Sequence, residues 1–336
     1  MPKSSPARGG KLRLHLENSR KKPQEKEYTL ARFALAARKH RALAKQLEVS
    51  VGYDGDISDA ELQKVDFMLG VPPNRARLKS GAPRLRWLHC TMAGIDSLLP
   101  LDWLPAKTIF TNNVGVHGAK AREYVRMAVT LLHTRLPQML SNQRAHKWQQ
   151  IFTPALAGRT ALVIGMGDVG GGAARAARDL GLRVIGVRKS GKASPLADRV
   201  VRLSQLDRVL PLADFVILAA PNTAETNGLL DARRIGLLKP QCGIVNISRA
   251  ALIDHAAMCV RLRDGSLSGA VLDVMQPEPL PAASPYWDVP NLIVTPHISC
   301  DDSDYAALTL ERWFANLERL LAHRQMQNRI DPKRGY

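Results

Sequence analysis

The chain has 336 residues, enough for two domains, and its hydrophobic content of 45% is ordinary for a globular protein. No apolar run reaches the roughly 18 residues that a bilayer-spanning helix needs, and the N-terminus lacks the apolar segment of a secretory signal. The formal net charge of +18 raises the question of a nucleic-acid partner.

The positive charge is concentrated at the start of the chain. Residues 1–45 hold 13 Lys or Arg against three acids, without an interleaved aromatic platform. This distribution favours a solvated surface over a nucleic-acid site. A weaker functional role for the charge is electrostatic steering of anionic substrates toward the protein. We therefore expect a disordered basic tail over residues 1–10, no nucleic-acid partner and no membrane partner.

The four cysteines show no metal-ligand spacing. They are Cys90, Cys242, Cys259 and Cys300, without a CxxC pair. Reduced thiols in a cytoplasmic protein are the simplest account of them, and the sequence predicts no metal site.

Strand and helix patterns alternate along the first part of the chain. Alternating residues predict a strand over 12–16, and helical spacing of apolar residues predicts a helix over 29–47. Further strands are predicted over 49–53, 67–71 and 85–90. A long helix is then predicted over about 119–149.

A glycine-rich turn follows the buried strand pattern at 161–164. Its GxGxxG run leads into a helix pattern at 173–180, and strand, glycines and helix together form the dinucleotide-binding fingerprint. This arrangement places a pyrophosphate on a helix N-terminus. The candidate cofactor-binding residues of the turn are Gly165, Gly167, Asp168, Val169 and Gly170.

The strand at 183–187 ends without the acidic residue that usually binds the ribose 2′-hydroxyl of NAD. It is followed by Arg188, Lys189 and Ser190. Two cations and a hydroxyl suit a 2′-phosphate, so we predict NADP as the cofactor, with NAD as the alternative. The same charges could instead be ordinary solvated residues at a strand end.

Apolar strands interleaved with helices continue to the end of the chain. They are predicted over 215–218, 243–247, 269–272 and 292–294, before an amphipathic helix over 304–323. The pattern predicts an α/β fold with doubly wound parallel sheets. We expect a Rossmann cofactor domain over 114–298, inserted into a flavodoxin-like substrate domain formed by 11–113 and 299–336.

Three polar residues follow strands in the predicted cofactor domain: Arg249, Glu278 and His297. Ligands of doubly wound sheets bind at the carboxyl ends of the strands. Reduction of a ketone by a nicotinamide needs a proton donor and a cation that orients the substrate. Each residue alone could be a cap or a loop charge, but together they favour a catalytic site.

With these motifs the chain resembles the D-isomer-specific 2-hydroxyacid dehydrogenase family, in particular its glyoxylate/hydroxypyruvate reductase-like branch. The resemblance covers about residues 85–325, and the first 80 residues match nothing specific. Its matching stretches are VIGMGDVG, ADFVILAAPNTAETNGLL, IVNISRAALID, GAVLDVMQPEPLP and IVTPHIS. The resemblance implies NAD(P)H-dependent reduction of a small 2-ketoacid to the D-2-hydroxy acid, in a homodimer.

The resemblance also implies residue roles. Arg249 would orient the substrate, His297 would be the general acid or base, and Glu278 would hydrogen-bond His297 and fix its tautomer. A loop at 91–96 would bind the substrate carboxylate, with Met92, Ala93 and Gly94 as its contact residues. Further implied cofactor contacts are Ala220, Pro221, Ile247 and Asp273.

The chain departs from the family pattern at two places. Ala250 follows Arg249 where the family usually has Gly, at a cost of about 1 kcal/mol if the position needs a positive φ. Met92 stands where smaller residues are common, so it can shape the pocket for a different acid.

Two other readings stay open. The formate dehydrogenase branch fits less well, because it pairs the histidine with Gln where this chain has Glu278. A dinucleotide-regulated, corepressor-like protein-binding module with little or no turnover is the alternative function, since such relatives keep the same residues.

Overall fold

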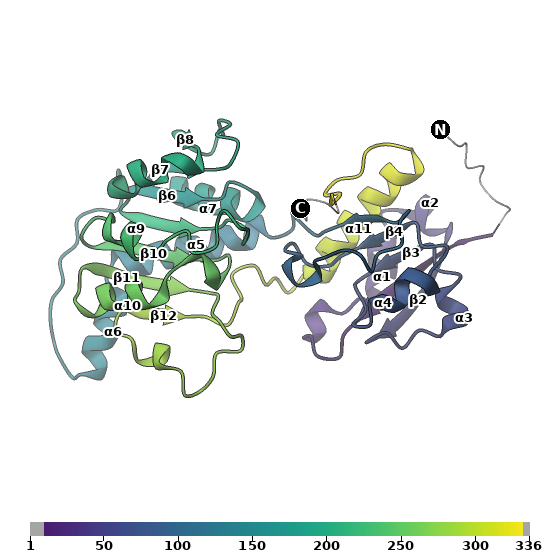
Figure 1. The fold of residues 1–336 in the computed structure, drawn as a ribbon, viewed down its shortest axis with the longest axis horizontal. Coiled ribbons are helices and arrows are strands. Elements are labelled where there is room, and N and C mark those ends of the chain that lie inside the picture. The colour runs from purple at the N-terminus through teal and green to yellow at the C-terminus, as the bar shows by residue number, and fades with distance from the viewer. Residues whose placement is uncertain (1–9, 332–336) are drawn as a thin grey trace. The chain divides into compact units, whose positions relative to one another are not determined.

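The structure is a computed structural model that describes residues 10–331 (Figure 1). The predicted basic tail, apart from Gly10, lies outside these residues. The chain divides into two compact units: the first runs up to Val116 and resumes at Asp302, and the second is His117–Asp301. These limits lie within three residues of the expected domain boundaries.

The first unit is built on a five-stranded parallel sheet with the strand order β2-β1-β3-β4-β5. Its strands are β1 (Leu12–Asn18), β2 (Leu47–Tyr53), β3 (Phe67–Leu69), β4 (Trp87–His89) and β5 (Ile109–Thr111). The order is that of flavodoxin-like folds, as predicted.

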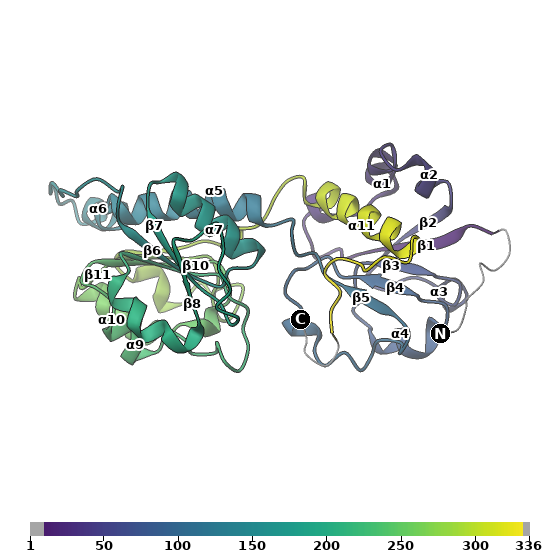
Figure 2. The same cartoon turned by 90° about the horizontal axis from the view of Figure 1, so that it is seen from above.

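Helices cover both faces of this sheet (Figure 2). One face packs against α1 (Leu30–Ala37), α2 (Arg41–Ala44) and α11 (Tyr305–Leu321). The other packs against α3 (Asp59–Leu62) and α4 (Ala76–Gly81). At the centre of the first face, the indole rings of Trp87 and Trp313 stack with centroids 5.1 Å apart.

The helix predicted over 29–47 is interrupted in the structure. His40 leaves the helical conformation with φ of −124°. Its ring stacks on Phe314 at 4.6 Å, and its Nε2 lies 3.2 Å from Oε2 of Glu311. Contacts with α11 therefore outweigh the local helical pattern, and Leu47 already begins β2.

The second unit is built on a seven-stranded parallel sheet with the order β12-β11-β10-β9-β6-β7-β8. Its strands are β6 (Thr160–Ile164), β7 (Arg183–Val187), β8 (Arg199–Val201), β9 (Phe215–Leu218), β10 (Cys242–Asn246), β11 (Leu267–Leu272) and β12 (Leu292–Val294). With β6 as its first strand, the sheet has the Rossmann order plus one further strand beyond β11.

The two faces of this sheet have separate cores. Ala161 and Val163 of β6 face α5 (Gly118–His133) and α7 (Asp168–Asp179), whereas Leu162 and Ile164 face the layer with α8 (Leu206–Val209), α9 (Ala232–Gly236) and α10 (His255–Arg263). Figure 2 shows α5 and α7 on one side of the sheet and α9 and α10 on the other. This alternation is what a strand buried on both faces requires.

The long helix predicted over 119–149 is two helices. α5 ends at His133, and α6 (Leu136–Arg144) begins after Arg135, which has a left-handed φ of 60°. Pro137 follows at the start of α6, where its missing N–H costs no intrahelical hydrogen bond. The prediction of one continuous helix was therefore wrong at this proline.

Candidate functional site

The glycine turn after β6 has the geometry of a dinucleotide cradle. Gly165 has a φ of +96°, and a Cβ at Gly170 would lie 1.7 Å from the carbonyl oxygen of Gly165, so both positions require glycine. At Gly167 a Cβ would meet no atom within 4 Å, so the turn is open there. No side chain caps the start of α7, which leaves N–H groups to bind an anion. The turn therefore fits a pyrophosphate.

The other two predicted residues of the turn are held by the protein itself. Asp168 Oδ2 accepts a hydrogen bond from the backbone N–H of His117 at 3.1 Å, which ties the start of α7 to the start of α5. Val169 packs against the core on the same face of the sheet. Because both side chains are engaged within the protein, Asp168 and Val169 would contact the cofactor through their backbone N–H groups.

The end of β7 presents the three residues predicted to meet a 2′-phosphate. Arg188 is half-buried, and Lys189 and Ser190 are exposed. Lys189 Nζ donates to Oε1 of Glu225 at 2.8 Å, and Ser190 Oγ accepts from the backbone N–H of Lys192 at 3.2 Å. The acid that meets this strand end thus comes from the loop after β9, and the sequence pattern did not reveal it.

The remaining predicted cofactor residues follow β9, β10 and β11. Ala220 and Ile247 are buried, and Pro221 is exposed. Asp273 is 1% exposed and accepts three hydrogen bonds, from Thr295 Oγ1 at 2.6 Å and from the backbone N–H groups of Ile298 and Ser299 at 2.8 Å. Asp273 therefore fixes the segment that carries His297, a role that the sequence did not indicate.

His297 and Glu278 meet directly. Nδ1 of His297 lies 2.8 Å from Oε2 of Glu278, and both side chains are exposed. The second carboxylate oxygen, Oε1, accepts from the backbone N–H of Met275 at 2.9 Å. Since an ionised carboxylate only accepts, Nδ1 of His297 is the donor, and Nε2 is the ring nitrogen left for proton transfer.

Arg249 lies at the carboxyl end of β10, half-buried. Asn246 shapes this turn by donating from Nδ2 to the carbonyl of Arg249 at 2.9 Å and by accepting from the backbone N–H of Ser248 at 3.0 Å. Ala250 is not among the described residues with a positive φ, so the strain considered for this position does not arise.

The register of the sheet brings the three predicted catalytic residues to one edge. β10, β11 and β12 are adjacent and parallel, and Arg249, Glu278 and His297 follow their respective carboxyl ends. Such an arrangement can orient an anionic substrate and exchange one proton with it.

The predicted substrate loop lies in the first unit, after β4. Two of its carbonyl groups accept hydrogen bonds. Asn112 Nδ2 donates to the carbonyl oxygen of Ala93 at 2.6 Å, and the backbone N–H of Asn113 donates to the carbonyl oxygen of Met92 at 3.0 Å. Within the described part of the chain, the N–H groups of Ala93 and Gly94 donate no hydrogen bond. They can therefore receive a carboxylate. Asn112 and Asn113 were not predicted to support this loop.

Residues 10–331 lack two further kinds of feature. No group of three or more His, Cys, Asp or Glu side chains is placed to hold a metal ion. No helix there is long and apolar enough to cross a membrane.

Comparisons with known proteins show the family of this chain. A family model described as D-isomer specific 2-hydroxyacid dehydrogenase, NAD binding domain, matches residues 127–299. Glyoxylate/hydroxypyruvate reductase A of Klebsiella pneumoniae is 26% identical over 281 residues, which cover 82% of this chain and 88% of that protein.

Two solved structures resemble the whole chain. The NADPH-dependent glyoxylate/hydroxypyruvate reductase of Sinorhizobium meliloti, in complex with NADP and sulfate, is 26% identical with a TM-score of 0.79, covering 96% of this chain and 99% of that one. A D-isomer specific 2-hydroxyacid dehydrogenase of Xanthobacter autotrophicus, in complex with NADPH and MES, is 26% identical with a TM-score of 0.82 and the same coverage. The chain therefore belongs to the D-isomer specific 2-hydroxyacid dehydrogenase family.

Proposed function

We propose that the chain is an NADP-dependent reductase that converts a small 2-ketoacid of the glyoxylate and hydroxypyruvate kind to the D-2-hydroxy acid. The observation that carries this proposal is the 2.8 Å contact between His297 and Glu278 on the same sheet edge as Arg249. A bound nicotinamide cofactor would supply the hydride for the carbonyl carbon.

The residues of the chain would supply the rest of the chemistry. His297 would hold a proton on Nε2 and pass it to the carbonyl oxygen, while Glu278 holds Nδ1 and stabilises the protonated ring. Arg249 would bind and polarise the substrate, because a guanidinium presents several N–H donors to a carboxylate. The N–H groups of Ala93 and Gly94 are the proposed backbone donors to the substrate carboxylate.

The preference for NADP is supported by Arg188, Lys189 and Ser190 at the end of β7. Two structural relatives carry NADP or NADPH, which agrees with this assignment. The glycine turn would hold the pyrophosphate, and Ala220, Pro221, Ile247 and Asp273 are the further proposed cofactor contacts. We also expect a cytoplasmic homodimer.

A direct assay tests this function. Purified protein is mixed with NADPH or NADH and a panel of 2-ketoacids, and the loss of absorbance of the reduced cofactor is followed. We expect turnover with NADPH, and chiral analysis of the product should give the D-hydroxy acid. Tight binding of NADPH without turnover of any 2-ketoacid would instead favour the corepressor-like alternative.

A further inference from the structure

A cavity of about 370 Å³ lies at the carboxyl edge of the sheet in the first unit. The loops that follow β1, β2, β3 and β4 all contribute to its wall, among them Lys22, Tyr28, Asp54, Arg75, Cys90 and Met92. At roughly 30 Å³ for each water-sized group, it has room for about twelve non-hydrogen atoms. That is more than a two-carbon ketoacid fills. We call this cavity the distal pocket.

Lys22 brings a cation without a partner to the distal pocket. Within the described residues its side chain forms no hydrogen bond or ion pair. Although the side chain as a whole is exposed, its ammonium group is partly removed from water, and this desolvation lowers the pKa of Lys22. The nearby Cys90 thiol opposes this shift and the Lys26 ammonium adds to it. An ammonium group in this position gains from an anionic partner.

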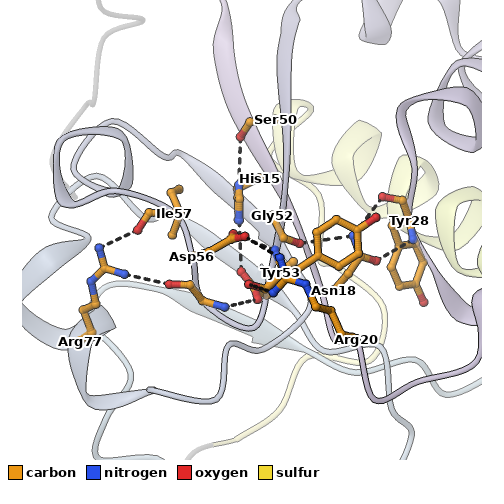
Figure 3. A network of polar contacts seen from close by, with 12 residues as sticks. His15, Asn18, Arg20, Tyr28, Ser50, Gly52, Tyr53, Asp56, Ile57 and Arg77 are labelled. Atoms are coloured by element: carbon orange, nitrogen blue, oxygen red, sulfur yellow. Dashed lines mark hydrogen bonds and ion pairs between the residues drawn. The ribbon is translucent and has the colours of Figure 1, made fainter.

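Tyr28 packs against the wall of the distal pocket. Its side chain is 3% exposed, and its hydroxyl is shielded from solvent. Asn18 fixes its backbone, accepting from the Tyr28 N–H at 2.7 Å and donating to the Tyr28 carbonyl at 3.3 Å (Figure 3). Because its hydroxyl is closed off from the pocket, Tyr28 shapes the wall, and the Lys22 ammonium group is what can meet an anion there.

Two of the acids in the wall are already engaged. Glu17 is 4% exposed; its Oε2 lies 3.2 Å from Nε2 of His15, and its Oε1 accepts from the backbone N–H of Gly55 at 2.7 Å. Asp54 forms an ion pair with Arg20 at 3.4 Å. Figure 3 shows the further contacts of these two partners, from His15 to Ser50 and from Arg20 to Asp56. Glu27 is the third acid of the wall. The wall also carries three cations, Lys22, Lys26 and Arg75.

We propose that the distal pocket binds a second anionic group of the substrate, a carboxylate or a phosphate, and that Lys22 selects it. The inference rests on the proposed reductase function and narrows its substrates to 2-ketoacids with two anionic groups. Met92 joins this pocket to the loop whose free N–H groups would hold the first carboxylate. The proposal also gives Lys22, in the basic N-terminal region, the function of binding the substrate.

Matched pairs of substrates test the proposal. With NADPH, 2-oxoglutarate is compared with 2-oxopentanoate, which lacks the second carboxylate, and 3-phosphohydroxypyruvate with hydroxypyruvate. We expect the dianionic member of at least one pair to have the higher kcat/KM, by about tenfold or more. The two pairs separate a carboxylate site from a phosphate site. Equal values within both pairs would overturn the proposal.

Variants assign the effect to Lys22. Lys22→Met should abolish the advantage of the dianion and leave the monoanion unchanged, with no loss of thermal stability because the replaced cation has no partner. Lys21→Met is the matched control, since Lys21 is exposed and does not line the pocket. Equal losses for both substrates in Lys22→Met would contradict the assignment.

Calorimetry separates this inference from the proposed function. Glutarate and 2-phosphoglycolate are titrated into the wild type and Lys22→Met, without turnover. If the wild type reduces no 2-ketoacid, the proposed function fails, yet anion binding that is lost in Lys22→Met still supports the pocket. If short 2-ketoacids are reduced but neither anion binds, the function stands and the distal pocket is refuted.

Discussion

Lys189 Nζ donates a hydrogen bond to Glu225 Oε1 at 2.8 Å, which joins the end of β7 to the loop after β9. Both side chains are exposed, at 72% and 54%, so the pair contributes little to stability. A 2′-phosphate bound at this strand end would meet the same ammonium group. Glu225 would therefore compete with such a phosphate for Lys189.

Glu225→Gln should tighten the binding of NADPH and leave the binding of NADH unchanged. Removing an exposed like charge near the phosphate is worth about 1 kcal/mol, or roughly fivefold in Kd. Fluorescence titration of the reduced cofactors measures both constants. Glu318→Gln, which opens the exposed pair with Arg324 in the first unit, is the control and should change neither. Equal shifts for both cofactors would show that Glu225 does not sense the phosphate.

Arg188→Asp should reverse the preference between cofactors. The change removes a guanidinium and introduces an acid where NAD-binding relatives of the fold hold the ribose. We expect NADPH binding to weaken relative to NADH by about tenfold or more, since charge-assisted hydrogen bonds to phosphate are lost. An unchanged ratio of the two dissociation constants would mean that the cations at this strand end do not select the cofactor.

The strands with long apolar runs were predictable from sequence, and two short ones were not. β5 (Ile109–Thr111) and β8 (Arg199–Val201) each contain only two consecutive apolar residues, flanked by polar ones, too few for a recognisable strand pattern. The glycine turn was found because its glycines lie within six residues of one another, and Gly165 and Gly170 each have a steric reason. The positions of Glu278 and His297 after predicted strands likewise indicated that the two residues lie at the same edge of the sheet, where they form a contact.

Contacts between residues far apart in the chain could not be predicted from the sequence. Glu225 meets Lys189 across 36 residues, and no pattern links them. Asn113 supports the substrate loop through Thr309, 196 residues away. Lys22 belonged to a basic region that looked like solvated surface, because its place in the distal pocket depends on loops from four strands. Such sites depend on tertiary assembly rather than local periodicity.

His297→Ala should lower kcat for 2-ketoacid reduction by about 10²-fold or more, as expected for the loss of a general acid. Because the side chain is exposed and lies outside the core, NADPH binding and thermal stability should be retained. Glu278→Gln keeps an acceptor for Nδ1 but removes the charge that stabilises the protonated ring, so a smaller loss is expected. Near-normal turnover by His297→Ala would remove His297 from the mechanism.

The fully buried His89 should make the first unit sensitive to acid. Burial lowers the pKa of His89 to about 4, with the charge of Arg312 adding to this shift and a hydrogen bond to Asn113 opposing it. Its Nδ1 lies 2.7 Å from the hydroxyl of Thr111, which also accepts from Trp87 Nε1. Nε2 faces Oδ1 of Asn113 at 3.4 Å, and because this oxygen can only accept, the neutral ring carries its proton on Nε2 and the Thr111 hydroxyl donates to Nδ1.

The sign of the pH effect follows from this depressed pKa. Between the ordinary pKa of about 6.5 and the folded value of about 4, the unfolded chain binds a proton at His89 that the folded chain does not. The free energy of unfolding should therefore fall as the pH drops through this window. From pH 7 to pH 5 the expected loss is about 2 kcal/mol from this residue.

Urea unfolding followed by tryptophan fluorescence can report this loss. The buried Trp87 and Trp313 lie in the first unit, whereas Trp148 and Trp287 of the second are exposed, so the change in signal comes mainly from the first unit. In His89→Gln the difference between pH 7 and pH 5 should shrink by about the same 2 kcal/mol. His323→Gln, which changes an exposed histidine, should keep the wild-type difference. If His89→Gln loses as much stability on acidification as the wild type, protonation of His89 does not control unfolding.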